Sequence, residues 1–399
     1  MTTAVTTQEL LRAMREEGHR ILDYWREHVI LPEGGFHGRV DSDGTVHPDA
    51  DRGVILAARI LWTYSRAVTS GFADTPENRK IAHGAFEFLR DHFWDPSYLG
   101  FYWLIDVADK PTMDYKHIYG QAFALYGLAE YTAMSASTQA LKLAQLTYTL
   151  IERHAADRVH GGYFEAFSRE WKLQEAYRKD IVNHGGPKSM NTHLHVLEAY
   201  SRLYQVWPSP ELKERLLSLL QLMRTRIVDN ETFHFNLFFD MDWRVVSDEA
   251  SYGHDIEGSW LMLEAAEILN DADEVTKCRT LALQMVDATL AEGVDADYGV
   301  LNEGRGKEIV DGNKHWWPQA EGVVGCVNAY QISHEEKYLR AARDIWSFID
   351  AKLIDRQHGE WLSKVSRDGV PNAADAKVDP WKCPYHNTRA CMEIVHRLG

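Results

Sequence analysis

Apolar residues recur at helical spacing along most of this 399-residue chain, and short glycine-containing segments interrupt them. Residues 54–64 and 122–129 each trace one apolar helical face, and residues 196–204 and 260–269 repeat the pattern. The few prolines stand at expected element boundaries, as in Asp95-Pro96, Trp207-Pro208 and Asp379-Pro380. The pattern predicts an all-α chain of about twelve helices.

A glycine-and-aromatic segment recurs six times between these apolar stretches, at intervals of roughly 60 to 75 residues. The copies are Gly34-Gly35-Phe36, Gly100-Phe101-Tyr102, Gly161-Gly162-Tyr163, Phe235-Asn236-Leu237-Phe238, Tyr298-Gly299-Val300 and Gly359-Glu360-Trp361. The stretches 35–44 and 360–369 pair alternation with an Asp-Gly turn, which predicts short β-hairpins. The interval fits one helical hairpin plus a turn in each repeat.

Six helical hairpins with small strands between them indicate an (α/α)6 barrel with short β-hairpins at one end. A single repeat cannot bury its apolar face alone, so we expect residues 1–399 to form one catalytic domain. An open superhelical array is the competing architecture. Closure is favoured because polar candidates follow every copy at a similar phase, which places them at the same end of a ring.

The composition narrows the range of partners and compartments. The formal net charge is -16 and no Lys/Arg cluster interrupts it, which disfavours nucleic acid and anionic membranes as partners. The four cysteines show no CxxC pairing, which suggests a reducing compartment. The amino-terminal residues lead into a charged amphipathic helix without a signal-peptide apolar region, and no stretch is long enough to span a bilayer. We expect a cytoplasmic monomer or homodimer.

Two histidine-containing segments stand at expected helix starts. In Gly253-His254-Asp255-Ile256-Glu257, His254 and Glu257 share a helix face, so the carboxylate can orient the imidazole. A first-turn Glu favoured by the helix dipole is the structural alternative. In residues 191–195, Asn191 and His195 share a face, whereas His193 diverges from His195. That divergence, without an HExxH or cysteine cluster, argues against a metal site, although either histidine can also be purely structural.

Aromatic and charged residues complete the candidate set. Trp317 and Glu321 are one helical turn apart, and the loop before a late helix delivers Trp381 and His386 to one rim. Tryptophan faces stack on sugar rings and carboxylates bind sugar hydroxyls, although most aromatic residues of a helical barrel serve packing. Arg59 lies on an otherwise apolar helix face, which hints at an inward charge with a polar ligand.

Two histidines facing one sugar suit proton transfer at the carbon beside a carbonyl. The aldehyde of an open reducing sugar acidifies the proton on C2, and imidazole titrates near neutral pH. One base removes that proton, a hydrogen-bonding group stabilises the enediolate, and a second base returns a proton to the opposite face. This chemistry needs neither a metal nor a nucleotide, and the sequence has no phosphate-binding loop. No cofactor is therefore expected.

At these residues the chain resembles the N-acylglucosamine 2-epimerase superfamily, and within it most closely the cellobiose 2-epimerases, which are (α/α)6 barrels. The resemblance covers nearly the whole chain, in order. Its motifs are Ala57-Ala58-Arg59-Ile60-Leu61-Trp62, Lys116-His117-Ile118-Tyr119, Lys188-Ser189-Met190-Asn191-Thr192-His193-Leu194-His195, Gly253-His254-Asp255-Ile256-Glu257, Trp316-Trp317-Pro318-Gln319-Ala320-Glu321 and Trp381-Lys382-Cys383-Pro384-Tyr385-His386-Asn387.

The resemblance implies a role for each candidate. His254 and His386 would be the acid/base pair at C2, and Glu257 would support His254. The residues that hold the C1 and C2 oxygens and the enediolate would be Arg59, Tyr119, Asn191 and His195. Those that bind the sugar rings would be Trp317, Glu321 and Trp381. The implied activity is inversion of C2 in the reducing-end glucose of a β-1,4 disaccharide such as cellobiose.

Three alternatives stay open at this point. A monosaccharide enzyme of the same fold would epimerise mannose at C2, or would move the proton from C2 to C1 and so interconvert mannose or glucose with fructose. A glycoside hydrolase or lyase would need a carboxylate pair, for which Glu257, Glu321 and Asp255 are available. A noncatalytic carbohydrate- or protein-binding role is the third.

Overall fold

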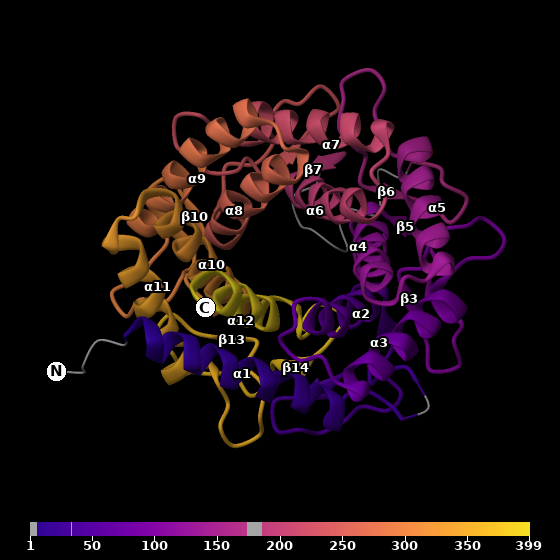
Figure 1. The fold of residues 1–399 in the computed structure, drawn as a ribbon, viewed down its shortest axis with the longest axis horizontal. Helices are drawn as coiled ribbons and strands as arrows, with labels where there is room; N and C mark the ends of the chain where they lie inside the picture. Colours follow the sequence, from indigo (N-terminus) through magenta and orange to yellow (C-terminus); the bar gives the residue numbers. More distant parts are fainter. Residues whose placement is uncertain (1–5, 33, 174–185) are drawn as a thin grey trace.

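The computed structural model describes residues 6–32, 34–173 and 186–399, and these form twelve α-helices arranged as two concentric rings (Figure 1). The inner ring contains the even-numbered helices, and each packs against the next around the circle until α12 meets α2. The inner helices are α2 (Val54–Thr69), α4 (Ile118–Ser135), α6 (Met190–Val206), α8 (Tyr252–Leu269), α10 (Trp316–Ser333) and α12 (Tyr385–Leu398). The expected closed (α/α)6 barrel is thereby confirmed.

The outer ring consists of the odd-numbered helices, and each packs on an inner neighbour. They are α1 (Thr7–His28), α3 (Pro76–Phe88), α5 (Thr138–His154), α7 (Pro210–Leu222), α9 (Ala272–Glu292) and α11 (Glu336–Phe348). Three of them continue into π-helical turns: η1 (Leu89–Phe93), η3 (Met223–Ile227) and η4 (Ile349–Leu353). The first helix, α1, packs on the last, α12, so one hairpin is built from both ends of the chain. This pairing excludes an open array.

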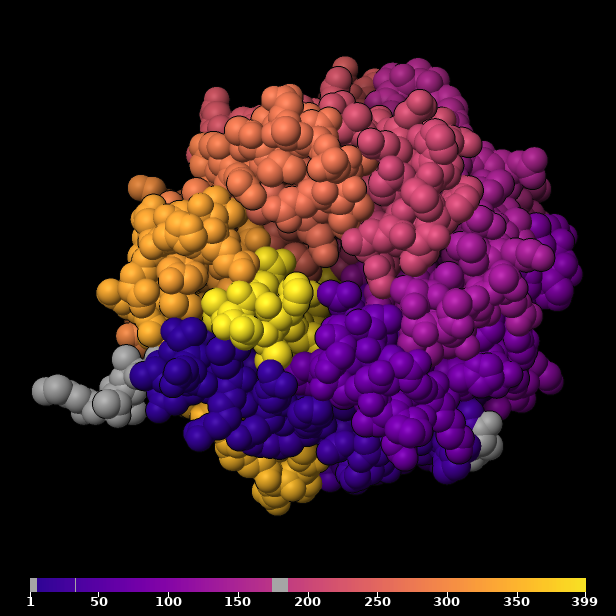
Figure 2. All heavy atoms as spheres, viewed as in Figure 1, coloured from indigo at the N-terminus to yellow at the C-terminus, as the bar shows by residue number. Residues whose placement is uncertain are grey.

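The two rings differ in burial because they face different surroundings. α4 is buried along nearly its whole length, whereas α1 and α11 bury one apolar face and expose the other. Figure 2 shows the C-terminal residues in the middle of one face of the molecule, beside the N-terminal helix. Within the described part of the chain, no helix is both long enough and apolar enough to cross a membrane.

Six small antiparallel sheets tie neighbouring repeats together. A strand that precedes an inner helix pairs with a strand from the following repeat, as β5 (Lys116–His117) does with β6 (Ala166–Phe167). The remaining strands are β1 (Val40–Asp41), β2 (Arg52–Gly53), β3 (Leu104–Ile105), β4 (Pro111–Met113), β7 (Lys188–Ser189), β8 (Phe238–Phe239), β9 (Ala250–Ser251), β10 (Glu303–Arg305), β11 (Glu308–Asp311), β12 (Lys314–His315), β13 (Lys364–Val365) and β14 (Ala376–Val378). Because β1 pairs with β14, the sheets also close the ring.

The expected hairpins are present at the Asp-Gly turns, where Val40 bridges Val46 and Val365 bridges Pro371. The strands of these hairpins also pair with strands of neighbouring repeats, which the sequence did not predict.

The glycine-and-aromatic segments hold the starts of the inner helices in place. Gln121, on the first turn of α4, accepts from the Phe101 amide at 2.8 Å and donates to the Phe101 carbonyl at 2.9 Å. His193 accepts from the Tyr163 amide at 2.9 Å. Further side chains at this helical level make equivalent contacts: Asp255 to Phe235 and Gln319 to Val300. The repeated motif therefore fixes the starts of α4, α6, α8 and α10, and His193 has a structural role.

Candidate active site

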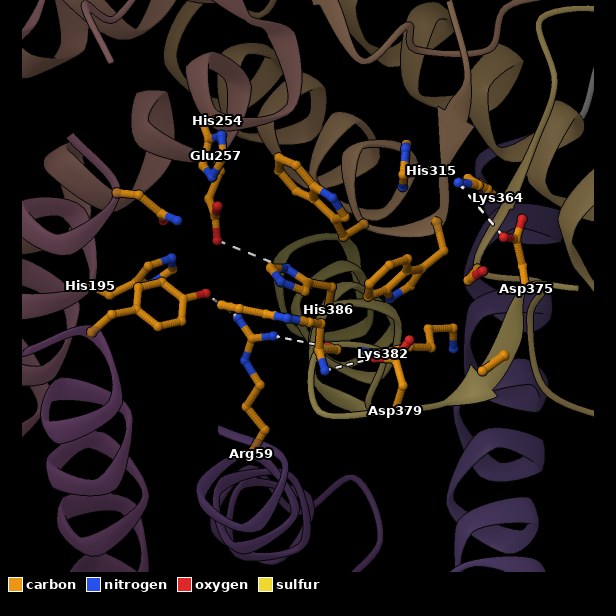
Figure 3. Close-up of a pocket in the computed structure, with 17 residues that line it drawn as sticks. Arg59, His195, His254, Glu257, His315, Lys364, Asp375, Asp379, Lys382 and His386 are labelled. Carbon is orange, nitrogen blue, oxygen red and sulfur yellow. Dashed lines mark hydrogen bonds and ion pairs between the residues drawn. The ribbon is translucent and has the colours of Figure 1, made fainter. Parts of the chain in front are cut away.

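A cavity of about 370 Å³ lies where the inner helices begin, and residues from all six inner repeats line it (Figure 3). The sequence-predicted residues on its wall are Arg59, Tyr119, Asn191, His195, His254, Glu257, Trp317, Trp381 and His386. The described residues on its outer part include His315, Trp316, Ser363, Lys364, Asp375, Asp379 and Lys382. The ring thus gathers side chains from distant parts of the chain into one pocket.

Three imidazoles of this wall are each anchored through Nδ1. The contacts are His386 to Glu321 Oε1 at 2.7 Å, His195 to Glu198 Oε2 at 3.0 Å, and His254 to Ser251 Oγ at 2.7 Å. Because the Nδ1–H of His386 or His195 donates to a carboxylate, its Nε2 carries the free lone pair. The anchored imidazoles therefore leave Nε2 as the nitrogen that can exchange a proton with a ligand.

Burial favours the neutral form of both predicted catalytic histidines. Desolvation lowers the pKa of His254 to about 3, and the nearby His195 and Arg59 add to that effect. Desolvation also lowers the pKa of His386 well below its ordinary value, and Arg59 and Arg389 add to that effect. A neutral imidazole accepts a proton, so either residue is in the protonation state that a general base requires.

Arg59 brings a positive charge and several donors to the cavity. Its guanidinium donates to the Tyr119 hydroxyl at 2.9 Å and to the Trp381 carbonyl at 3.3 Å, and it lies 4.2 Å from the Phe123 ring centroid. Its side chain is 3% exposed although it carries no carboxylate partner among these contacts. The guanidinium is therefore available to an anionic or carbonyl oxygen in the cavity.

Three buried oxygens on the cavity wall lack a hydrogen-bond partner among the described residues: Asn191 Oδ1, Glu257 Oε2 and Asp375 Oδ2. An unpartnered buried polar atom costs about 1–3 kcal/mol. Hydroxyl groups of a ligand would satisfy these acceptors. The wall is therefore suited to a polyhydroxylated molecule.

Aromatic rings shape the space between the histidines. The Trp317 ring centroid lies 4.6 Å from that of His254 and 5.7 Å from that of His386. Gly253 allows this approach, because a Cβ there would lie 2.6 Å from the Trp317 ring. Trp381 is 42% exposed at the rim, which leaves part of its indole face accessible.

Two sequence interpretations need correction. Glu257 was expected to support His254, but Ser251 is the partner of His254 Nδ1, and Glu257 Oε1 lies 3.9 Å from His386 Nδ1. Glu321 was expected to contact the sugar, but it is 0% exposed and lies behind His386 rather than on the cavity wall. Its carboxylate accepts from His386, Trp260 and Arg389. One helical turn separates it from Trp317, and that turn carries it beneath the pocket floor.

Arg389, Glu198 and Ser251 are the supporting residues that sequence analysis missed. Arg389 follows His386 by three residues, Glu198 follows His195 by three, and Ser251 precedes His254 by three. Residues three apart on a helix share a face, so a charged or hydroxyl side chain at that offset was an available signal. The contacts of Arg389 with Glu257 and Glu321 could not be predicted in this way, because nothing in the sequence pairs α12 with α8 and α10.

One group of described side chains has the spacing of a metal site. Ligand atoms of Glu257, Glu321 and His386 all lie within 4.8 Å of one another. The Nη2 atom of Arg389 already donates to Glu257 Oε1 at 2.5 Å and to Glu321 Oε1 at 2.7 Å. A guanidinium thus already bridges these two carboxylates.

Comparison with known proteins agrees with this geometry. Residues 34–390 match the N-acylglucosamine 2-epimerase (GlcNAc 2-epimerase) family. The chain is 40% identical over 381 residues to a cellobiose 2-epimerase of Bacteroides fragilis, covering 94% of this chain and 96% of that protein. It is 23% identical to a D-mannose isomerase of Marinomonas mediterranea, covering 92% and 93% of the two chains.

A solved structure of cellobiose 2-epimerase from Bacillus thermoamylovorans superimposes with a TM-score of 0.92 and 35% identity, covering 98% of this chain and 100% of that one. The match in sequence extends across the barrel, including the helices that carry the anchored histidines. The chain therefore belongs to the N-acylglucosamine 2-epimerase family and is an isomerase.

Proposed function

We propose that the chain inverts C2 of the reducing-end glucose in cellobiose-type β-1,4 disaccharides, giving the mannose epimer. The observation that carries this proposal is the pair of anchored, neutral imidazoles, His254 and His386, on one cavity wall. The similarity to cellobiose 2-epimerases supports the substrate class. The proposed substrate is thus a small sugar.

The reaction begins with the sugar in its open form, with an aldehyde at C1. One imidazole Nε2 takes the proton from C2, the C2–H electron pair forms the C1–C2 double bond, and the aldehyde oxygen becomes an enediolate oxygen. In the reacting form the other imidazole carries one proton; it returns this proton to the opposite face of C2, and the carbonyl re-forms. The two bases exchange protonation states, so atoms and charge balance over the step.

Arg59, Tyr119, Asn191 and His195 would bind the oxygens at C1 and C2. Arg59 supplies a fixed positive charge, which is most useful when the enediolate develops negative charge. Its hydrogen bond to Tyr119 and its packing on Phe123 hold the guanidinium in one orientation. Electrostatic stabilisation of this kind lowers the barrier without reorganisation at the moment of reaction.

Trp317 and Trp381 would bind the sugar rings through their faces. Trp317 lies between the two imidazoles, and the exposed Trp381 stands at the rim, where a second ring of a disaccharide would leave the pocket. Glu321 and Glu257 would act behind His386, since their carboxylates stabilise the imidazolium that forms there.

An aldose–ketose isomerase is the second candidate, and the similarity to a D-mannose isomerase favours it. It shares the first proton transfer but returns the proton to C1 of the enediolate. The test is incubation with cellobiose, and separately with mannose, in deuterated water, followed by NMR of the products. Deuterium at an inverted C2 supports the epimerase, whereas a ketose product would replace it with the isomerase. Release of free glucose from cellobiose would point to hydrolysis.

A further inference from the structure

A single guanidinium, that of Arg389, connects three inner helices beneath the cavity. Arg389 is 1% exposed and donates through Nη2 to Glu257 and Glu321, and through Nη1 to Glu198 and the Tyr385 hydroxyl. The three carboxylates come from α6, α8 and α10, while Arg389 belongs to α12. This residue therefore joins four of the six inner helices at one point.

Two of those carboxylates also hold histidines of the site. Glu321 accepts from His386 Nδ1 at 2.7 Å, and Glu198 accepts from His195 Nδ1 at 3.0 Å. Arg389 does not line the cavity and would not touch a sugar. It contacts His386 and His195 only through the carboxylates that it binds, although its charge also lowers the pKa of His386.

The guanidinium stands where a cation is required. Glu257 and Glu321 are both 0% exposed, and their oxygens lie with His386 Nδ1 inside the 4.8 Å spacing of a metal site. Buried like charges repel strongly unless a cation lies between them. The planar fork of arginine can bond two carboxylates at once, which a lysine ammonium does less well. Arg389 thus supplies a positive charge and a bridging geometry at the position where a metal ion would otherwise lie.

We propose that Arg389 is a positioning residue that takes the place of a metal ion, fixing the carboxylates that orient His386 and His195. The inference rests on the proposed function for its kinetic consequences. Its structural core, a cation site occupied by a side chain, is independent of which sugar reacts.

The kinetic test is Arg389→Ala, assayed with the sugar that the wild type converts. We expect kcat to fall by about 10²-fold or more while KM changes by less than about threefold, because the lost group acts through the histidines rather than on bound sugar. Guanidinium at about 50 mM, far below denaturing molar concentrations, should restore part of the lost kcat. The described residues around a second hollow, at the other end of the inner ring, include Arg389, so a small cation has a path to the vacated position. A folded variant with unchanged kcat, or one that guanidinium does not rescue, overturns the kinetic part.

The binding test uses Zn²⁺ alone and does not depend on activity. Calorimetry should show one Zn²⁺ bound by Arg389→Ala, none bound at this position by the wild type, and none bound by Arg389→Ala/His386→Asn. A wild type that binds Zn²⁺ through His386, or a folded Arg389→Ala that binds none, contradicts the substitution of a side chain for an ion.

Arg389→Lys keeps the test decisive if the alanine variant does not fold. Lysine retains the charge but contacts fewer carboxylate oxygens, so we expect kcat to fall roughly tenfold with KM little changed. An unchanged kcat in Arg389→Lys contradicts the need for a fork. If the wild type shows no sugar conversion, the proposed function fails, while the Zn²⁺ result still decides the cation site.

Discussion

The two imidazoles of the site differ in the group that is bonded to Nδ1, a carboxylate for His386 and a hydroxyl for His254. His386 donates to the buried Glu321, has Glu257 at 3.9 Å, and lies above the guanidinium of Arg389. His254 is anchored instead by the Ser251 hydroxyl at 2.7 Å, and Arg59 is among the groups that lower its pKa. Burial and nearby charges favour the neutral form of both imidazoles, but only His386 has a carboxylate bonded to its Nδ1.

This contrast predicts that the two proton transfers are not equivalent. A proton taken up by His386 meets a carboxylate at once, and a charge-assisted hydrogen bond is worth about 1.5–3 kcal/mol. A proton taken up by His254 meets a hydroxyl and nearby positive charge. When one imidazole of the pair is protonated, we therefore expect His386 to be the one that holds the proton and His254 to act as the base.

The largest effect tests whether both imidazoles, His254 and His386, are needed for the reaction. His386→Ala and His254→Ala should each lower kcat by on the order of 10²–10⁴, the usual worth of a positioned acid or base. In deuterated water, each variant should still exchange the C2 proton of the one epimer whose C2–H faces the remaining imidazole, without inversion. NMR of the recovered sugar measures this. Near-native turnover in either variant would remove that histidine from the mechanism.

The next largest effect compares the two anchors. Glu321→Gln replaces the carboxylate bonded to His386 with a neutral amide, and we expect kcat to fall about 10- to 100-fold with KM nearly unchanged. The matched control on the other wall is Ser251→Ala, which removes only a hydroxyl and should cost less than about tenfold. Steady-state kinetics of the pair decide the matter. A larger fall in kcat for Ser251→Ala than for Glu321→Gln would show that His254, and not His386, depends more on its Nδ1 partner.

A smaller effect is expected from the ring that both walls share. Trp317 contacts both imidazoles, so Trp317→Ala should raise KM roughly tenfold through lost stacking, with a lesser change in kcat. Trp317→Phe, which keeps an aromatic face, is the control, and its KM should lie between the KM values of the wild type and Trp317→Ala. A fall in kcat without a change in KM would show that Trp317 positions the histidines instead of the sugar.

The smallest effect concerns stability on the His254 wall. The folded pKa of His254 is about 3, against 6.5 for the unfolded chain, so the unfolded chain binds more protons between those values. This contribution is full above pH 6.5 and is lost as pH falls toward 3. Denaturant unfolding at about pH 7.5 and about pH 5 should show the wild type losing more free energy of unfolding than His254→Gln.

The comparison of variants cancels an opposing contribution from Glu257. Desolvation and the Glu321 charge raise the pKa of Glu257 to about 7, so its contribution is full below pH 4.5 and is lost as pH rises through 7. Both proteins keep this residue. Equal losses in the wild type and His254→Gln would show that His254 is not desolvated in the folded chain.

Sequence periodicity predicted the barrel correctly because each repeat carries its own helical pattern and its own glycine-and-aromatic segment. A similar phase in every repeat also brought Arg59, Asn191 and Trp317 to one pocket, as the cavity shows. The predicted support of His254 by Glu257 was wrong, because helical spacing states which residues share a face and not which neighbour across the ring they contact.

The sequence by itself determined the six repeats, the helix starts and the set of residues that face one end of the ring, since these follow from local periodicity and turn chemistry. The tertiary structure decided which carboxylate serves which histidine. It placed Glu321 beneath His386 and inserted Arg389 between two buried glutamates, because long-range packing of α12 against α2 and α10 closes the ring. Such contacts join residues far apart in the chain, and no local pattern encodes them.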